Sequence, residues 1–198
     1  MEKQKIFIAT ANANKVREFR ELLEPRGYEV SSILDLQKPF DIEENGTTFA
    51  ENAVIKAEGA CRKLQIPCLA DDSGLEIDAL NKEPGIYSAR WLGHDTSYDY
   101  KNQVVLERMQ GKKDRACRYV CAIALAKPNA ETVVFEDTCE AVIAEQPYGK
   151  SGFGFDPIIY YEPLKMTMAE MTPEQKNAIS HRGKAMRKME AYLDAHQS

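Results

Sequence analysis

The sequence predicts a mixed α/β fold. A strand-like run from Lys5 to Thr10 precedes apolar residues at helical spacing from Asn14 to Glu24, which is how α/β units begin. Two β-rich runs, 118–126 and 132–144, lie near the middle of the chain. The 198 residues, 43% hydrophobic and 29% charged, are enough for a sizeable core. One domain over residues 1–198, single or folded as two lobes, is therefore expected.

Local signals predict two further elements in the first half. A short strand is expected from Tyr28 to Ser31. A helix is expected from Thr48 to about Gln65, because Thr48 and Glu51 match the capping-box pattern.

Two adjacent carboxylates, Asp71 and Asp72, end a strand expected from Cys68 to Ala70. A buried carboxylate costs several kcal/mol unless a positive group meets it. One interpretation is a turn, since Asp-Asp-Ser-Gly is a typical turn sequence, and for the isolated stretch this is favoured. The other is a site for a hard cation such as Mg²⁺, which takes one or two carboxylates beside water and phosphate. Alternating strand character resumes from Leu75 to Leu80.

The second half adds a helix, a hairpin and a loop. The helix is expected from Asp99 to Met109. The two β-rich runs are separated by residues 127–130, which are good turn formers, so they are expected to form a hairpin. The glycine-aromatic segment from Tyr148 to Asp156 is expected to be a loop.

A long C-terminal helix is expected to begin after Thr172. Thr172, Pro173 and Gln175 match the N-cap, first-turn proline and capping-box signals. Gly183 costs about 1 kcal/mol inside a helix, so a break is expected there.

Composition excludes several classes of protein. The five cysteines are odd in number and form no CxxC pair, which favours buried thiols over a disulfide framework or a zinc site. The net charge of −5 argues against non-specific binding to nucleic acid. No apolar run reaches the roughly 18 residues of a membrane span, and the N-terminus lacks a signal-peptide pattern. A cytoplasmic protein without membrane or nucleic-acid partners is expected.

The segment TANANK joins the first expected strand to the first helix. Free N–H groups and the positive end of the helix dipole favour an anion at such a junction. The alternative is an ordinary N-cap by Asn12 or Asn14 with a solvated Lys15, and on these residues alone it is preferred. The candidate phosphate-binding residues are Thr10, Ala11, Asn12, Ala13, Asn14 and Lys15.

Charged residues also flank the start of the second helix. Glu43 and Glu44 precede it, and Asn52 and Lys56 share one of its faces. A charge pair at a helix start is ordinarily solvated and favoured by the dipole. If the helix packs beside the strand that ends at Asp72, however, a glutamate and Lys56 reach the aspartates.

The loop SGFGFDP alternates glycines with aromatic residues. Its ordinary interpretation is a tight loop whose rings cap the core. The functional interpretation is a loop that binds a ligand. In it, the glycines let the backbone approach the ligand, the rings stack on a flat base, and the aspartate forms hydrogen bonds with the edge of the base. The candidates are Phe153, Gly154, Phe155 and Asp156.

Three candidates with N–H donors lie in the C-terminal helix. Ordinarily Lys176, His181 and Arg182 would form a basic, solvated helix face with a surface histidine. The functional interpretation is a set of donors directed at a nucleotide, with Arg182 suited to planar contacts.

Six motifs follow one another along the chain: TANANK, EENGTTFAENAVIK, LADDSGL, PGIYSAR, GFGFDP and ISHRG. Together they resemble the inosine triphosphate pyrophosphatase family, which hydrolyses non-standard purine nucleoside triphosphates. The resemblance extends from Ile6 to about Gly183. Two positions depart from the family pattern: Ala11 stands where glycine is usual, and Phe155 where tyrosine is common. Neither change removes a charged group.

The resemblance implies a fold and an activity. The fold is a mixed elongated sheet with flanking helices, forming two lobes around a nucleotide cleft in a homodimer. The activity is Mg²⁺-dependent cleavage of ITP, dITP or XTP to the monophosphate and pyrophosphate, which keeps deaminated purines out of nucleic acids. By position, the implied roles are phosphate binding by residues 10–15 and Lys56, general base and metal ligand for Asp72, metal ligand for Glu44, substrate contact for Ser73, and purine binding by Phe153, Gly154, Phe155, Asp156, Lys176, His181 and Arg182.

The chemistry of the residues agrees with this activity. Triphosphate oxygens repel a nucleophile until cations neutralise them and a base orients water. Neighbouring Asp71 and Asp72 favour a raised pKa in one of them, since like charges disfavour joint ionisation. The alternative is a non-catalytic purine-nucleotide-binding regulatory protein, which would not need Glu44 as well as Asp72. A phosphotransferase is disfavoured because the chain has no GxxxxGK[ST] loop.

Overall fold

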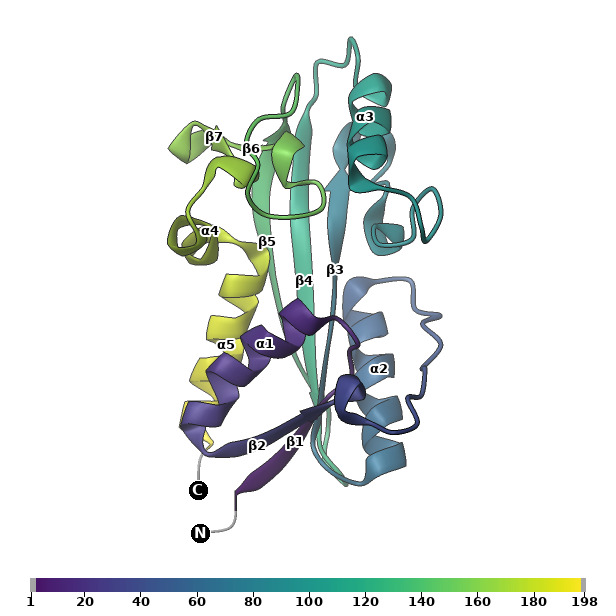
Figure 1. Cartoon of the computed structure of the whole chain (residues 1–198), viewed down its shortest axis with the longest axis vertical. Coiled ribbons are helices and arrows are strands. Elements are labelled where there is room, and N and C mark those ends of the chain that lie inside the picture. The colour runs from purple at the N-terminus through teal and green to yellow at the C-terminus, as the bar shows by residue number, and fades with distance from the viewer. Residues whose placement is uncertain (1–2, 197–198) are drawn as a thin grey trace. The chain divides into compact units, whose positions relative to one another are not determined.

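A computed structural model describes residues 3–196 and confirms the mixed α/β class. Seven strands form a sheet in the order β2-β1-β3-β4-β5-β6-β7 (Figure 1). β1 is parallel to β2 and β3, whereas β6 is antiparallel to β5 and β7. The strands are β1 (Gln4–Ile8), β2 (Tyr28–Ser32), β3 (Cys68–Ile77), β4 (Ala116–Ala126), β5 (Val133–Ile143), β6 (Ile159–Tyr161) and β7 (Met166–Thr167). The α-helices are α1 (Ala13–Leu23), α2 (Phe49–Leu64), α3 (Tyr98–Arg108), α4 (Pro173–Ile179) and α5 (His181–Ala195).

The chain divides into two compact units. The described part of unit 1 comprises residues 3–72, 122–136 and 185–196, and unit 2 comprises residues 73–121 and 137–184. The boundary in β3 falls between Asp72 and Ser73. The nucleotide cleft expected between two lobes stays a prediction.

Unit 1 is built around the first strand and helix. Ile6, Phe7 and Ile8 of β1 are at most 1% exposed. α1 runs beside β1 and β2 (Figure 1) and buries Val16, Phe19 and Leu23, the apolar positions that predicted this helix. The buried stripe of α1 therefore fixes the helix start, Lys15 included, close to the end of β1.

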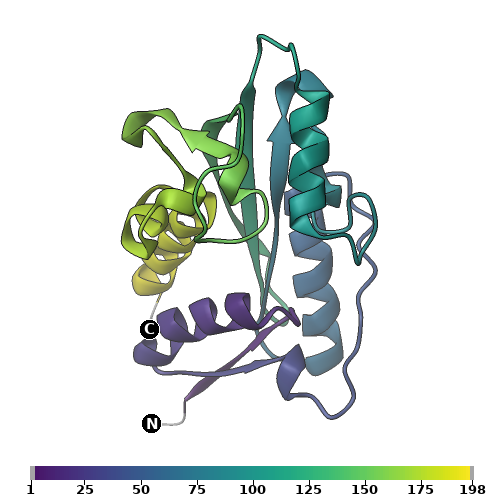
Figure 2. The same ribbon diagram turned by 45° about the horizontal axis from the view of Figure 1, so that its top comes forward.

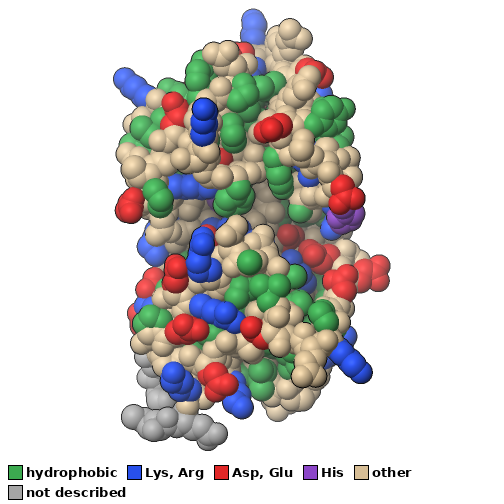
Figure 3. Space-filling view, in the orientation of Figure 1, with side chains coloured by type: hydrophobic (Ala, Val, Ile, Leu, Met, Phe, Trp, Pro, Cys, Tyr) green, Lys and Arg blue, Asp and Glu red, His purple; other side chains and the backbone are tan. Residues whose placement is uncertain are grey.

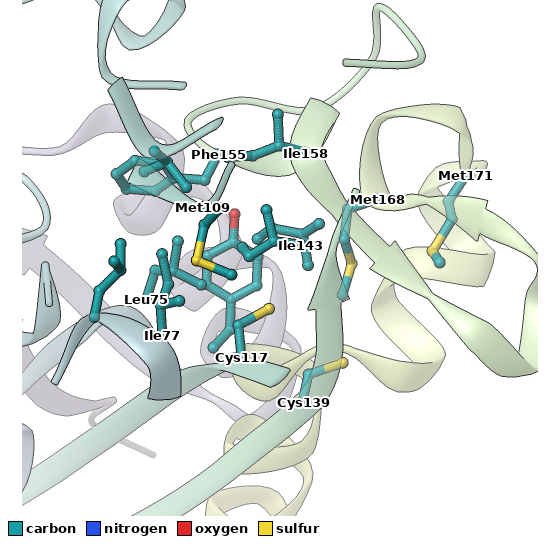
Figure 4. Packing of buried hydrophobic residues seen from close by; sticks show 14 residues of the cluster. Leu75, Ile77, Met109, Cys117, Cys139, Ile143, Phe155, Ile158, Met168 and Met171 are labelled. Atoms are coloured by element: carbon teal, nitrogen blue, oxygen red, sulfur yellow. The ribbon is translucent and has the colours of Figure 1, made fainter. Parts of the chain in front are cut away.

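Unit 2 has its own apolar core. α3 lies along β3 (Figure 2), and Val105 and Met109 pack with Leu75 and Ile77 in one buried cluster. Phe155 belongs to the same cluster (Figure 4). This core holds the glycine-aromatic loop through the Phe155 ring.

The expected turn after Ala70 is wrong. β3 continues without interruption from Cys68 to Ile77, through Asp71, Asp72 and Ser73. Turn propensity is overridden here, because the strand is paired and its first acid meets a cation described below. An extended backbone points consecutive side chains to opposite faces, so Asp71 and Asp72 have different surroundings.

The C-terminal region contains two helices instead of one long helix. α4 ends at Ile179, and Ser180 is extended with ψ 151° before α5 begins at His181. The break therefore lies before Gly183, which sits in the first turn of α5. A Cβ at Gly183 would collide with the backbone oxygen of Asn177, so close approach of the two helices explains this glycine.

Two helix starts test the capping predictions. The capping box of Thr172 and Gln175 is confirmed. At α2, Thr48 Oγ1 accepts from the Glu51 N–H at 3.1 Å, as expected for an N-cap. The Glu51 carboxylate accepts hydrogen bonds from the N–H and hydroxyl of Thr47, the residue before the cap.

The surface carries both signs of charge. On the face shown in Figure 3, Lys and Arg side chains are interspersed with Asp and Glu. None of the helices in residues 3–196 combines the length and the apolar character of a membrane span.

Candidate functional site

Asn12 caps the junction between β1 and α1. Its Oδ1 accepts hydrogen bonds from the N–H groups of Asn14 at 3.0 Å and Lys15 at 3.3 Å. The Asn12 N–H donates to Thr10 Oγ1 at 3.2 Å. The N-cap interpretation is therefore confirmed for Asn12. Residues 11–14 are exposed, so the backbone of this turn is open to a ligand, and their phosphate role stays a prediction.

Lys15 forms an ion pair with Asp71. Its Nζ lies 2.7 Å from Asp71 Oδ2, and the two side chains are 18% and 1% exposed. The alternative of a solvated Lys15 is therefore wrong. A cation at the start of α1 meets the buried carboxylate of β3, which explains how the strand tolerates paired acids.

Lys56 of α2 contacts the same strand. Its Nζ donates to the backbone oxygen of Asp71 at 2.7 Å and lies 3.4 Å from Glu44 Oε2. The expectation that a glutamate and Lys56 reach the aspartates is confirmed. Asn52, one turn earlier, is 1% exposed and accepts from the Gly46 N–H at 2.9 Å, which holds the segment that carries Glu44.

Asp72 has an altered acidity. Burial raises the pKa of Asp72 from 3.8 to about 6, and repulsion by Glu44 adds to the rise, while attraction to Lys56 opposes it. From the sequence, such a pKa shift was expected to arise from repulsion between Asp71 and Asp72. The structure corrects that reason to burial and Glu44, because Asp71 is ion-paired. Asp72 is thus mostly ionised near neutral pH and able to take up a proton.

The glycine-aromatic loop of unit 2 presents its two rings differently. The Phe153 ring is 59% exposed, with Lys176 Nζ 4.4 Å from its centroid. The Phe155 ring is 3% exposed and packs edge-on against Tyr98, as the core-capping interpretation predicts. Phe153 is therefore the ring of this loop available for stacking on a ligand.

Asp156 is hydrogen-bonded within the protein. The residue is 2% exposed; its Oδ1 accepts from the Tyr119 hydroxyl at 3.1 Å, and its Oδ2 from the Phe153 N–H at 2.9 Å and Lys176 Nζ at 2.5 Å. Gly152, with φ +75°, leaves room for this carboxylate, which a Cβ would strike. Direct reading of a base edge by Asp156 stays a prediction, as does the place of Gly154 in the pocket.

The start of α5 carries the last two candidates. The His181 ring stacks on Tyr119 with centroids 4.7 Å apart and planes at 22°, so it is not an ordinary surface histidine. Arg182 Nη2 donates to Ser73 Oγ at 3.3 Å. Two predicted residues 109 positions apart in the chain are thereby brought into contact.

Three residues of these groups were not predicted as site residues. Asp71 was noted beside Asp72, but nothing in the sequence showed that it pairs with Lys15. Asn52 shares a helix face with Lys56, and that spacing was the available signal. Tyr119 lies in a β-rich run, where no local pattern links it to a loop far along the chain.

Known proteins match nearly the whole chain. A profile described as the Ham1 family matches residues 6–192. A Halalkalibacterium halodurans protein named dITP/XTP pyrophosphatase is 50% identical over 190 residues, covering 94% of this chain and 97% of that protein. A Geobacillus kaustophilus protein of the same name is 49% identical over 189 residues, covering 94% and 93%. The solved structure of the Staphylococcus aureus Ham1 protein has a TM-score of 0.93 and 42% identity, covering 98% of this chain and 100% of that one.

Proposed function

Because the chain belongs to the Ham1 family, we propose that it is a nucleoside triphosphate pyrophosphatase that hydrolyses dITP, ITP and XTP to the monophosphate and pyrophosphate. The names of the relatives support the substrate class. The structural observation that carries the proposal is Asp72, a partly buried carboxylate with a raised pKa among Glu44, Lys56 and Lys15. A base can activate water for phosphoanhydride hydrolysis, and two cations can stabilise the charge that develops on the phosphate oxygens.

We propose Mg²⁺ as the cofactor, held by Glu44 and Asp72. The donor set fits a hard cation, because these two carboxylates are close enough for Glu44 to raise the pKa of Asp72. Among residues 3–196, no group of three or more His, Cys, Asp or Glu side chains is arranged to hold a metal. A two-carboxylate site suits an ion that completes its shell with water and phosphate. When bound, such an ion neutralises charge on the phosphate oxygens.

The protein's own groups have separate tasks in this proposal. The Asp72 carboxylate accepts the proton of the attacking water. Lys15 and Lys56 bind phosphate oxygens while their contacts with Asp71 and Glu44 keep the two ammonium groups in place. Thr10 and the exposed residues 11–14 add polar groups beside Lys15.

Purine selection is assigned to unit 2. Phe153 offers an exposed ring for stacking, and Lys176, His181 and Arg182 offer donors. Hypoxanthine and xanthine carry an oxygen at C6 that accepts from such donors. Adenine carries an amino group there, which would leave donors facing a donor, so adenine is disfavoured. The Ser73 hydroxyl, which accepts a hydrogen bond from Arg182, is assigned a further substrate contact in this proposal.

We also propose a homodimer in the cytoplasm. For the dimer, three large side chains between residues 87 and 100 of unit 2 are exposed and available to a partner subunit: Tyr87 at 55%, Leu92 at 45% and Tyr100 at 54%. Light scattering on the purified chain tests the assembly, and a monomer at working concentrations would contradict it.

The activity is tested by pyrophosphate release from dITP, XTP, ITP, ATP and GTP, with Mg²⁺ and with excess EDTA. We expect turnover of the first three, much slower turnover of ATP, loss with EDTA and recovery when Mg²⁺ is restored. Tight binding of dITP without turnover would favour the regulatory alternative. Equal turnover of ATP and dITP would contradict the purine-selective pocket.

A further inference from the structure

Tyr119 is a buried phenol whose hydroxyl is not needed for packing. It lies on β4, is 8% exposed and belongs to the apolar cluster of unit 2. A buried hydroxyl costs free energy unless it is hydrogen-bonded, so phenylalanine would fill an ordinary core position without that cost. The Tyr119 hydroxyl donates to Asp156 Oδ1 at 3.1 Å. Burial first, then the charge of Asp156, raises the pKa of Tyr119 well above 10, so the phenol remains a donor.

The two partners of Tyr119 come from segments that are distant in sequence. Its hydroxyl contacts Asp156 at the end of the glycine-aromatic loop, and its ring stacks on His181 at the start of α5. Asp156 in turn holds the Phe153 N–H and the Lys176 ammonium. Tyr119 therefore contacts His181 directly, and it contacts Phe153 and Lys176 through Asp156; all three are assigned to the purine.

We propose that Tyr119 is a positioning residue for purine recognition. Its hydroxyl fixes the Asp156 carboxylate that orients Phe153 and Lys176, and its ring fixes the imidazole plane of His181. The inference rests on the proposed function, because that function assigns these groups to the purine. Tyr119 itself acts through Asp156 and His181 and needs no contact with substrate.

Tyr119→Phe is the first test, since it removes one oxygen and keeps the stacking ring. Asp156 Oδ1 then loses its phenol donor, and the carboxylate is free to turn away from the geometry that holds Lys176. We expect KM for dITP to rise roughly tenfold and the preference for dITP over dATP to fall by a similar factor. We expect kcat to stay within about twofold, because Asp72 is untouched. Inhibition by inorganic pyrophosphate, which has no base, should not change.

Tyr119→Leu is the second test, because it removes both hydroxyl and ring. It should weaken selectivity further than Tyr119→Phe, since His181 also loses its stacking partner. The matched control is Tyr161→Phe, which removes a phenol hydroxyl from a ring packed against the same cluster and should leave KM and selectivity unchanged.

The outcomes separate the inference from the proposed function. If Tyr119→Phe lowers the melting temperature but leaves KM for dITP and the dITP preference at wild-type values, Tyr119 is structural and the inference is overturned. An equal rise of KM for dITP and of the inhibition constant for pyrophosphate would overturn it as well. If the wild-type protein does not hydrolyse dITP at all, the proposed function fails first.

Discussion

Two aspartates, one in each unit, have contrasting surroundings. Asp156 in unit 2 is buried and accepts three hydrogen bonds that occupy both of its oxygens. Asp72 in unit 1 is half-buried, and burial together with Glu44 raises its pKa to about 6. The first carboxylate is hydrogen-bonded on both oxygens, whereas the second has a higher pKa than an ordinary aspartate.

The difference indicates which carboxylate organises a site and which one reacts. A carboxylate whose two oxygens accept several hydrogen bonds holds the donor groups in place. A carboxylate that is desolvated and lies near another acid is destabilised when ionised, and a proton or a cation relieves that cost. Removing the charge of a desolvated carboxylate should therefore stabilise the fold, whereas removing the charge of a carboxylate held by donors should destabilise it.

The largest expected effect is that of Asp72→Asn. The amide cannot accept the proton of water, so turnover of dITP should fall by about 10²- to 10⁴-fold. The metal-free variant should nevertheless be more stable than wild type at neutral pH, by roughly 1–3 kcal/mol, because an ionised group with a raised pKa is lost. Pyrophosphate release and urea unfolding without metal measure the two effects.

The sign of this stability effect follows from the pKa of Asp72, which is about 6 when folded against 3.8 ordinarily. The folded state binds the proton more tightly, so the contribution favours folding below about pH 4 and is lost as pH rises through about 6. The stability gain of Asp72→Asn should therefore shrink toward acid pH. Asp41→Asn, at an exposed acid of the same unit, is the control. If Asp72→Asn were less stable than wild type at neutral pH, the ionised Asp72 carboxylate would not destabilise the fold, contrary to this prediction.

The second expected effect concerns the ion pair of Lys15 and Asp71. Lys15→Met leaves a carboxylate of 1% exposure without this cation, so stability should fall by roughly 3 kcal/mol. Affinity for inorganic pyrophosphate should fall as well, because a phosphate-binding cation is lost.

A double variant separates these two roles of Lys15. Lys15→Met with Asp71→Asn removes both charges, so it should recover most of the stability but not the pyrophosphate affinity. Calorimetric titration with pyrophosphate checks the affinity. If the double variant binds like wild type, Lys15 serves only to neutralise Asp71.

Much of the fold was predictable because local patterns set it. The apolar spacing of α1 and the capping residues of α4 identified these helices, and the helix over α3 matched within one residue at each end. The turn expected at Asp71 and Asp72 failed because strand pairing and the Lys15 contact are long-range. The break predicted at Gly183 lies instead at Ser180, because Gly183 is required by its close approach to the Asn177 backbone of α4, which is not visible in the local sequence.

The site shows the same division between local and distant information. Motif order identified Lys15, Lys56 and the aspartates, and the structure brings these residues into contact. Residue type alone did not distinguish the exposed ring of Phe153 from the buried ring of Phe155. The role of Tyr119 depends on two contacts made by segments 37 positions away or farther, which no local pattern encodes.

A smaller effect is expected on selectivity from Arg182→Ala. The preference for dITP over dATP should fall by about tenfold, because one donor toward the C6 oxygen is lost. The ratio of kcat/KM values measures the preference, with Arg62→Ala, at an arginine whose side chain is 71% exposed, as control. If the ratio of kcat/KM for dITP over dATP were unchanged, Arg182 would not take part in purine recognition.

The smallest expected effect comes from Asp78, an acid outside the proposed site that resembles Asp156 in its donors. Hydrogen bonds from Arg118 first, then from Lys82, lower the pKa of Asp78 from 3.8 to about 2. The ionised form is stabilised by folding, so its contribution is present above about pH 4 and is lost as pH falls through about 2, the opposite of Asp72. Asp78→Asn should therefore cost about 1 kcal/mol at neutral pH, progressively less toward pH 2, and leave dITP turnover unchanged. Urea unfolding across this pH range checks the trend; a pH-independent loss would show that Asp78 contributes through packing and neutral hydrogen bonds instead of through its charge.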